Sequence, residues 1–318
     1  MKKNIRNIEE RNSEIKRLEF YISSSCRNNC IFCGEKDLLE DFKGQFVAKA
    51  EVEREIKKRA KAGFNFLVLT GGEPTLHPDI VEIAKLAKRL RYQVFVNSDG
   101  GRFSEENFCR KIMPHIDYLS FSIYGHIDRL HNLHTRNGKS FSILKKSLEN
   151  VEKIPAETKI SARILITKHN FSKLTRIIDF ISRYKRVKKI LFSGLAPEGR
   201  ALENYRNLVV PLGEIRKKIP LLARLVAKKS RKIKFFGLPV CVLGELKDRS
   251  SDTKWHFQIT LKKIRRDKRT VLAETEGFKP LKGVMKPDKC LRCSKKDFCP
   301  GIFEKYYQEF GDGELIVQ

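Results

Sequence analysis

The sequence lacks any apolar run that could cross a membrane, since stretches such as residues 221–227 fall far short of the roughly 20 residues that a spanning helix needs. No apolar core follows the charged N-terminal residues, so no secretory signal is visible. Internal repeats and low-complexity segments are absent as well. These absences exclude a membrane-spanning or collagen-like protein, and we expect a cytoplasmic location.

Acidic residues are scarce: 38 Asp and Glu stand against 66 Lys and Arg, which gives a net charge of +28. The excess recurs along the chain, at residues 183–189, 228–234 and 262–269. A positive field of that size attracts nucleic acid, anionic lipid or acidic substrates. A lysine-rich solvated surface has the same composition. The charge therefore leaves nucleic-acid binding and simple solubility both open.

What is present is enough for a folded core, because 41% of the 318 residues are hydrophobic. Apolar runs rich in β-branched and aromatic residues alternate with segments of helical period. Because strand and helix alternate strictly, we expect parallel strands joined by crossover helices. The strands are expected at 18–24, 64–70, 93–98, 118–124, 159–167 and 188–192, and the helices at 49–62, 78–91, 105–115, 141–153 and 172–185.

Six such units predict an α/β fold, a partial (β/α)6 TIM-type barrel with its chemistry at the C-terminal ends of the strands. A doubly wound open sheet satisfies the same periodicity. After residue 205 the rhythm changes. We expect a basic arm at 1–17, the barrel at 18–205, a connecting helix at 206–236 and a small metal-stapled domain at 237–318.

Three of the eight cysteines, Cys26, Cys30 and Cys33, follow the first expected strand directly. Three thiolates on one loop can bind three irons of a cubane cluster, and a full four-cysteine site would need a fourth ligand that is missing nearby. One iron would then be open to an exogenous group. A three-cysteine zinc site, or three reduced thiols, is the alternative.

This C-x3-C-x2-C run, with an aromatic residue before its last cysteine, resembles the signature of the radical S-adenosylmethionine (radical SAM) superfamily. The Gly-Gly-Glu-Pro segment at 71–74 ends the second strand and is placed like the GGE motif of that family. The resemblance covers about residues 18–205. It implies a 4Fe–4S cluster that binds SAM, with the methionyl amino group held at the GGE segment. The residues concerned are Phe32, Gly71, Gly72 and Glu73.

Further resemblances lie at the ends of later strands. Asn97 and Ser98 end the third strand and are placed to face the cofactor, Ser122 is the candidate ribose contact, and Arg163 is the candidate contact of the SAM carboxylate. Residues 193–201 look like the loop that closes the site. Strand-end polar groups satisfied within the chain, or a surface arginine, would explain the same residues without a ligand.

A second group of cysteines stands near the C-terminus. Cys290, Cys293 and Cys299 form a C-x2-C-x5-C run, and Cys241 lies upstream. The run resembles the SPASM or twitch extension of radical SAM enzymes, and four cysteines imply one auxiliary 4Fe–4S cluster. Zinc held by the same four ligands is the alternative. Cys109, inside a helical pattern, is expected to be a core thiol.

The resemblance implies an enzyme that reductively cleaves SAM to a 5′-deoxyadenosyl radical and abstracts a hydrogen from its substrate. A peptide or protein to be oxidised or cross-linked is the first expectation, and a tRNA, nucleotide or sugar is the second. A reductase, flavodoxin or ferredoxin would supply electrons. His131 and His134 are expected in a loop, either at the surface or orienting substrate.

A non-catalytic iron–sulfur protein, for electron transfer or sensing, is the alternative from a different class. The missing fourth ligand and the Gly-Gly-Glu-Pro segment count against it, because electron carriers close all four ligand positions.

Overall fold

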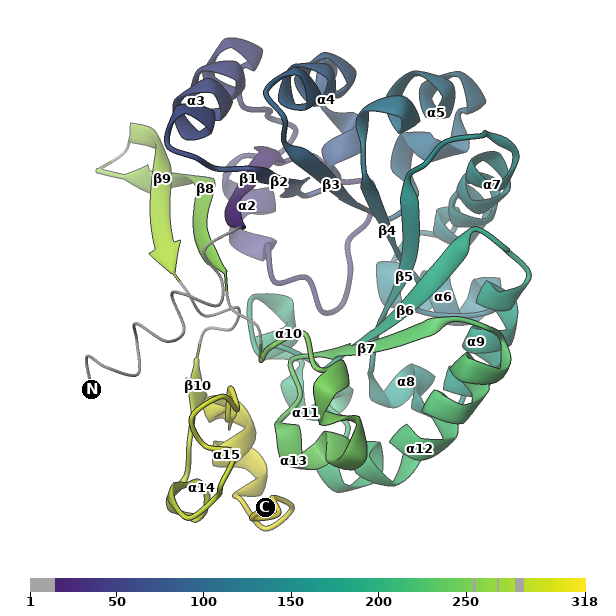
Figure 1. Cartoon of the computed structure of the whole chain (residues 1–318), viewed down its shortest axis with the longest axis vertical. Coiled ribbons are helices and arrows are strands. Elements are labelled where there is room, and N and C mark those ends of the chain that lie inside the picture. The colour runs from purple at the N-terminus through teal and green to yellow at the C-terminus, as the bar shows by residue number, and fades with distance from the viewer. Residues whose placement is uncertain (1–14, 254–255, 268, 278–282) are drawn as a thin grey trace.

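A computed structural model describes residues 15–253, 256–267, 269–277 and 283–318. Most of the expected N-terminal arm at 1–17 therefore lies outside the described residues. One nine-stranded sheet, in the order β7-β6-β5-β4-β3-β2-β1-β8-β9, curves into an open barrel (Figure 1). Its strands are β1 (Lys16–Ser23), β2 (Phe66–Gly71), β3 (Gln93–Ser98), β4 (Tyr118–Ser122), β5 (Lys159–Leu165), β6 (Val187–Ser193), β7 (Lys232–Phe236), β8 (Phe257–Arg266) and β9 (Arg269–Gly277).

The predicted partial barrel is confirmed. Strands β1 to β6 are neighbours in chain order and all pair in parallel, which excludes the doubly wound alternative because that fold reverses its strand order. The helices α3 (Lys49–Lys61), α4 (Ile80–Arg89), α5 (Glu106–Ile112), α7 (Ser140–Lys153), α9 (Leu174–Ser182) and α12 (Leu212–Lys228) lie outside the arc of strands (Figure 1). The shorter helices are α2 (Lys36–Asp41), α6 (Asp128–Thr135), α8 (Lys168–Phe171), α10 (Arg200–Glu203) and α11 (Tyr205–Leu208).

The core lies between the strands and these helices. On α4, the apolar residues that recur at the helical period, Ile80, Ile83, Ala84 and Ala87, are fully buried, and Leu90 is partly buried. Cys109 is also fully buried, as expected of a core thiol. Among the described residues, no helix has both the length and the apolar composition to span a bilayer.

The barrel continues beyond residue 205, where the sequence indicates that the rhythm ends. After α12, strand β7 pairs in parallel with β6, and β8 pairs in parallel with β1 at the other end of the arc. β9 then runs antiparallel to β8. β7 is short and was not among the expected strands, although the alternation of its lysines with the buried Ile233 and Phe235 is a strand signal.

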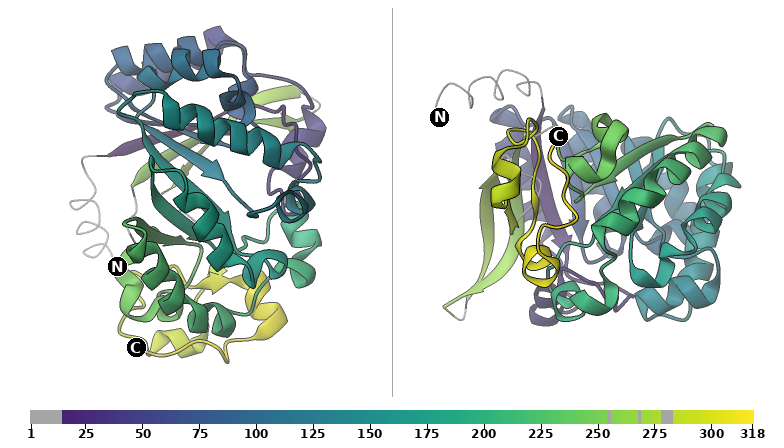
Figure 2. Two further views of the ribbon diagram at one scale, coloured as in Figure 1. Left: turned by 90° about the vertical axis from the view of Figure 1, so that its right-hand side faces the viewer. Right: turned by 90° about the horizontal axis from the view of Figure 1, so that it is seen from below.

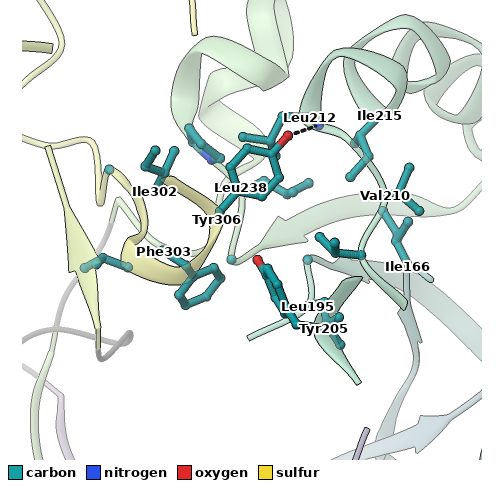
Figure 3. A pocket seen from close by; sticks show the side chains of 16 residues that line it. Ile166, Leu195, Tyr205, Val210, Leu212, Ile215, Leu238, Ile302, Phe303 and Tyr306 are labelled. Carbon is teal, nitrogen blue, oxygen red and sulfur yellow. Dashed lines mark hydrogen bonds between the residues drawn. The ribbon is translucent and has the colours of Figure 1, made fainter. Parts of the chain in front are cut away.

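The chain ends in small elements outside the strand arc (Figure 2). They are α13 (Val240–Leu243), η4 (Gly244–Arg249), β10 (Val284–Met285), α14 (Asp288–Leu291), β11 (Ile302–Phe303) and α15 (Glu304–Phe310). Figure 3 shows the apolar pocket where they meet the barrel, with Tyr306 beside Leu212 and Leu238 and with Phe303 nearer to Tyr205. The Tyr306 hydroxyl accepts a hydrogen bond from the Leu212 backbone N–H at 2.8 Å, which anchors α15 on α12.

Candidate functional site

Cys26, Cys30 and Cys33 lie on the loop that follows β1, and all three thiols are half-buried. Burial raises the pKa of each thiol, and the neighbouring Cys33 raises that of Cys30 further. Their thiolate forms therefore need a compensating positive charge, which iron ions supply. The three residues fit a cluster with three protein ligands.

Two other parts of the barrel hold this loop. The backbone N–H groups of Asn29 and Ile31 donate to carbonyls at the end of α6, at 2.9 and 3.0 Å. Arg200 N–H donates to the Cys33 carbonyl at 2.9 Å. Gly199 has a φ of +51°, and a Cβ there would lie 2.5 Å from the Cys33 carbonyl oxygen, so only glycine allows this approach. The segment at 193–201 thus packs against the cysteine loop, as its resemblance implies.

The glycine pair at the end of β2 packs closely against the residues just before Cys26. A Cβ on Gly71 would lie 2.2 Å from the Ser23 carbonyl oxygen, and one on Gly72 would lie 2.5 Å from that of Ser25. Gly72 and Glu73 donate their N–H groups to the same two carbonyls at 2.8 Å. Backbone hydrogen bonds therefore hold the Gly-Gly-Glu segment against the residues directly before Cys26, which lie 48 and 49 positions earlier in the chain.

The Glu73 carboxylate, which is 1% exposed, is already used by the chain itself. It accepts hydrogen bonds from Thr75 N–H at 3.0 Å, Thr75 hydroxyl at 2.6 Å, Ser98 hydroxyl at 3.0 Å and Asp99 N–H at 2.8 Å. Burial, together with the nearby Asp99 carboxylate, raises its pKa well above the usual value. The carboxylate ties β2 to β3, so we propose that backbone groups of this segment, rather than the carboxylate, contact the SAM amino group.

Replacing Glu73 by alanine should destabilise the fold, because it leaves four buried donors without their acceptor. With about 1 to 3 kcal/mol for each unmet group and some relief from water, we expect a loss of about 3 to 5 kcal/mol in the free energy of unfolding. Urea unfolding measures it. The matched control is Glu82→Ala, whose exposed carboxylate pairs only with Lys85 and contributes little. Equal losses in the two variants would contradict the buried role of Glu73.

Asp99 is a site residue that sequence reasoning missed. One oxygen of its carboxylate accepts from the Asn28 side chain at 2.5 Å and lies 3.9 Å from the Cys26 sulfur, while the other accepts from Gly101 N–H at 2.8 Å. Its position one residue after Asn97 and Ser98, at the end of β3, was the available signal. Ser98, 3% exposed, donates to Glu73 and accepts from Gly100 N–H, so its hydroxyl serves the fold.

The remaining expected contacts lie on strands facing the barrel interior. Ser122 on β4 is the register partner of Arg163 on β5, and both are half-buried. Arg163 Nε donates to the Ser193 hydroxyl at 3.1 Å, and the guanidinium lies over the Phe236 ring at 5.4 Å. The reading of Arg163 as a surface residue is therefore wrong. Asn97 on β3 is half-buried as well.

Phe32, His131 and His134 form an aromatic group behind the cysteine loop. The Phe32 ring meets Tyr124 edge-on at 4.7 Å, and Tyr124 stacks on His134. Both histidines are fully buried on helix α6, so the expectation of a loop is wrong. Burial lowers the pKa of His131 to about 3 and that of His134 to about 4, which keeps both neutral. The His134 ring forms a hydrogen bond with the Thr167 hydroxyl, and the His131 ring forms one with the Ser140 hydroxyl.

The four other expected ligands, Cys241, Cys290, Cys293 and Cys299, line one pocket together. Burial raises the pKa of Cys290, and the other three thiols raise it further, so all four are near one another. Lys286, Lys289, Lys295 and Lys296 line the same pocket and would offset thiolate charge.

This set fits a four-thiolate cluster. In the part of the chain that the structure describes, no three His, Cys, Asp or Glu side chains gather as a site for one metal ion. Zinc held by the same four cysteines stays the alternative, because both a cluster and a zinc ion accept four thiolate ligands.

Comparison with protein families agrees with this geometry. The model of the Radical SAM superfamily matches residues 20–181, which is 162 of the 318 residues. The chain therefore belongs to the radical SAM superfamily, whose members use a 4Fe–4S cluster and SAM. The cysteine-rich C-terminus is consistent with an auxiliary cluster.

Curated relatives are similar to this chain over part of its length. The S-adenosylmethionine-dependent nucleotide dehydratase of Flammeovirga pacifica is 28% identical over 35% of this chain and 39% of its own length. The chain spans about two-fifths or less of the first curated relatives that it matches.

Among solved structures, anSMEcpe with bound AdoMet aligns over 96% of this chain and 93% of its own, at a TM-score of 0.65 and 15% identity. Streptococcus suis SuiB bound to the precursor peptide SuiA aligns over 74% of this chain and 52% of its own, at a TM-score of 0.54 and 15% identity. These two likenesses establish the fold.

Proposed function

We propose that this protein reductively cleaves SAM and uses the resulting radical to abstract a hydrogen from a peptide or protein, which it oxidises or cross-links. The observation that carries the proposal is the pair of backbone hydrogen bonds from Gly72 to Ser23 and from Glu73 to Ser25. They hold a backbone segment that only glycine permits against the residues directly before Cys26. A non-catalytic electron carrier needs no such segment.

Cys26, Cys30 and Cys33 would bind the cluster through three of its irons. When bound, the reduced cluster supplies the electron that splits SAM into methionine and a 5′-deoxyadenosyl radical. The backbone of Gly71 and Gly72 would receive the methionyl amino group. Through their hydrogen bonds, Glu73, Ser98 and Asp99 would hold that segment and the cysteine loop in fixed positions relative to each other.

Arg163 is suited to the SAM carboxylate, because Ser193 and the Phe236 ring hold its guanidinium inside the barrel. Ser122, its register partner, and Asn97 would contact the ribose and its surroundings from β4 and β3. Phe32, packed edge-on against Tyr124, would shield the cluster from water. Cys241, Cys290, Cys293 and Cys299 would hold the auxiliary cluster in a domain that we assign to the C-terminal region.

Peptide modification is the first choice of substrate because the fold neighbour SuiB binds a precursor peptide. A reductase, flavodoxin or ferredoxin would supply the electrons, in a cytoplasmic setting. A nucleotide is the second candidate. It is favoured by the paired basic residues Lys189 on β6 and Lys232 on β7, which are register partners, and by the nucleotide dehydratase among the relatives.

The test is an anaerobic assay with dithionite, SAM and short peptides encoded beside the gene. We expect methionine and 5′-deoxyadenosine, a loss of two hydrogens or a new cross-link in the peptide, and transfer of deuterium from a labelled peptide into 5′-deoxyadenosine. Mass spectrometry measures all three. Deuterium transfer from a nucleotide or tRNA instead would replace the peptide with the second candidate.

A further inference from the structure

The positive charge of the chain is concentrated on two neighbouring helix–strand units. The segments 173–189 and 214–234, which run from α9 into β6 and from α12 into β7, hold 16 Lys and Arg residues against two acidic residues. Their net charge of +14 is half of the total of +28, although they make up 38 of the 318 residues. β6 pairs with β7, and α9 contacts α12. The excess charge therefore gathers on one side of the barrel (Figure 1).

The outward face of α12 carries a row of exposed cations. Four exposed residues recur there at intervals of four, three and four positions, so they share one face of the helix. They are Lys217, Leu221, Arg224 and Lys228. The apolar residues of the opposite face are buried in the core. At 1.5 Å per residue, the row is about 16 Å long.

Helix α9 extends this basic surface. Lys173 and Arg183 flank the helix, Arg176 lies within it, and all three are exposed. Because packed helices lie about 8 to 10 Å apart, the cations of α9 and α12 form one continuous surface on the outside of the barrel (Figure 1). We call it the α9–α12 face, and its cations are Lys173, Arg176, Arg183, Lys217, Arg224 and Lys228.

Acidic residues balance little of this face. In the described part of the chain, two ion pairs involve the segments of α9 and α12, one between Lys217 and Glu214 and the other between Lys229 and Asp179. The other five cations of the α9–α12 face form no ion pair with a described residue. The charge of the face is therefore exposed to solvent and largely of one sign.

Helix α3, on the same barrel, has a different arrangement. Its exposed cations Arg54, Lys57 and Lys58 each pair with a glutamate three or four residues away. Solubility is served by such mixed charge, whereas like charges one turn apart, such as Arg224 and Lys228, destabilise a helix. Solubility therefore does not account for the α9–α12 face, which is suited to a partner that carries repeated negative charge.

The chemistry of the face favours a nucleic acid over a membrane. A helix that lies on a lipid surface inserts a broad apolar face, and Leu221 is the one exposed large hydrophobic residue on α9 and α12, both of which are described in full. A sugar–phosphate backbone offers regularly spaced charges, which Lys and Arg bind without apolar contacts.

We propose that the α9–α12 face binds the phosphate backbone of a nucleic acid. Because phosphates carry no base information, the contact is independent of sequence. The inference goes beyond the proposed function. The face lies on the outside of the barrel, whereas the cysteine loop and the glycine pair lie at the ends of β1 and β2. The nucleic acid is therefore a further partner, whichever substrate reacts with the radical.

The test is fluorescence anisotropy of a labelled RNA duplex of about 20 base pairs, titrated with the full chain at several salt concentrations. A DNA duplex and phosphatidylserine vesicles are the other two arms. We expect saturable binding of a duplex, with a slope of log affinity against log salt of about −5, as six phosphate contacts would give. The triple variant Lys217→Gln/Arg224→Gln/Lys228→Gln should change the slope to about −3 and weaken binding about 100-fold at ~0.1 M salt.

The matched control is Arg54→Gln/Lys57→Gln/Lys58→Gln, because it removes the same charge from an exposed face of α3. It should bind within about threefold of wild type, since screening weakens its influence at a distance. The proposal is overturned if no duplex binds saturably, if the α3 variant weakens binding as much as the α12 variant does, or if vesicles bind in preference to both duplexes. The duplex that binds more tightly identifies RNA or DNA as the partner.

SAM cleavage by the same preparations separates this inference from the proposed function. The α12 variant should cleave SAM like wild type, which also shows that it is folded. Duplex binding by a chain that cannot cleave SAM would contradict the function and leave the α9–α12 face standing as a nucleic-acid site. SAM cleavage without duplex binding would do the reverse.

Discussion

Replacing Cys30 by alanine is expected to abolish the formation of 5′-deoxyadenosine from SAM. Cys30 is the central residue of the three-thiol loop, and the loop has no fourth cysteine that could take its place. A cubane with only two protein ligands is no longer held. Iron should therefore fall from about eight to about four atoms per chain, with the remaining iron at the C-terminal cysteines.

The measurement combines iron analysis with chromatography of 5′-deoxyadenosine after dithionite reduction. Cys109→Ala is the matched control, because it also removes one thiol, but from the helical core, where Cys109 donates to the Phe103 carbonyl at 2.9 Å. It should keep its iron and its SAM cleavage while losing some stability. Wild-type turnover by the Cys30 variant would remove the central assignment of this site.

Removing Cys241, Cys290, Cys293 and Cys299 together is expected to leave SAM cleavage possible while stopping product formation. The four thiols share one pocket outside the barrel, whereas the SAM residues lie at the strand ends. The auxiliary cluster would take the substrate electron or anchor the substrate. Without it, SAM would be cleaved without a modified product.

Metal analysis decides between a cluster and zinc at this site. Wild type should hold about eight irons, and the triple variant Cys26/Cys30/Cys33→Ala about four, since each cubane contributes four. The triple variant is also the natural control, because it should lose SAM cleavage entirely. A wild-type content of four irons and one zinc would overturn the auxiliary cluster and leave the radical SAM core intact.

The local motifs could be predicted from the sequence alone. Cys26, Cys30 and Cys33 are close in sequence, so their spacing alone gathers the thiols on one loop. The alternation of strand and helix predicted parallel strands covered by helices, because each unit buries a periodic apolar face, as Ile80, Ile83 and Ala84 do on α4.

Contacts between segments that are distant in the chain could not be predicted from the sequence. Glu73 resembles a ligand residue by motif, and only the tertiary structure shows four donors from η1 (Pro74–Leu76) and the end of β3 converging on its carboxylate. His131 and His134 belong to a polar stretch that suggests a loop. His134 instead bonds Thr167, 33 residues away, and His131 bonds Ser140, nine residues on, and their full burial makes both neutral core residues.

The sequence by itself indicated the superfamily, parallel strands with crossover helices and the two cysteine sets, because each depends on short-range spacing or periodicity. The strand order, which separates a barrel from a doubly wound sheet, came from the tertiary structure. Only the tertiary structure decided which basic residues of β6 and β7 lie side by side. Lys189 and Lys232 count among many basic residues in the sequence. The pairing of β7 with β6, between strands about 40 residues apart, makes them register partners, and strand register is a property of the folded sheet rather than of either segment.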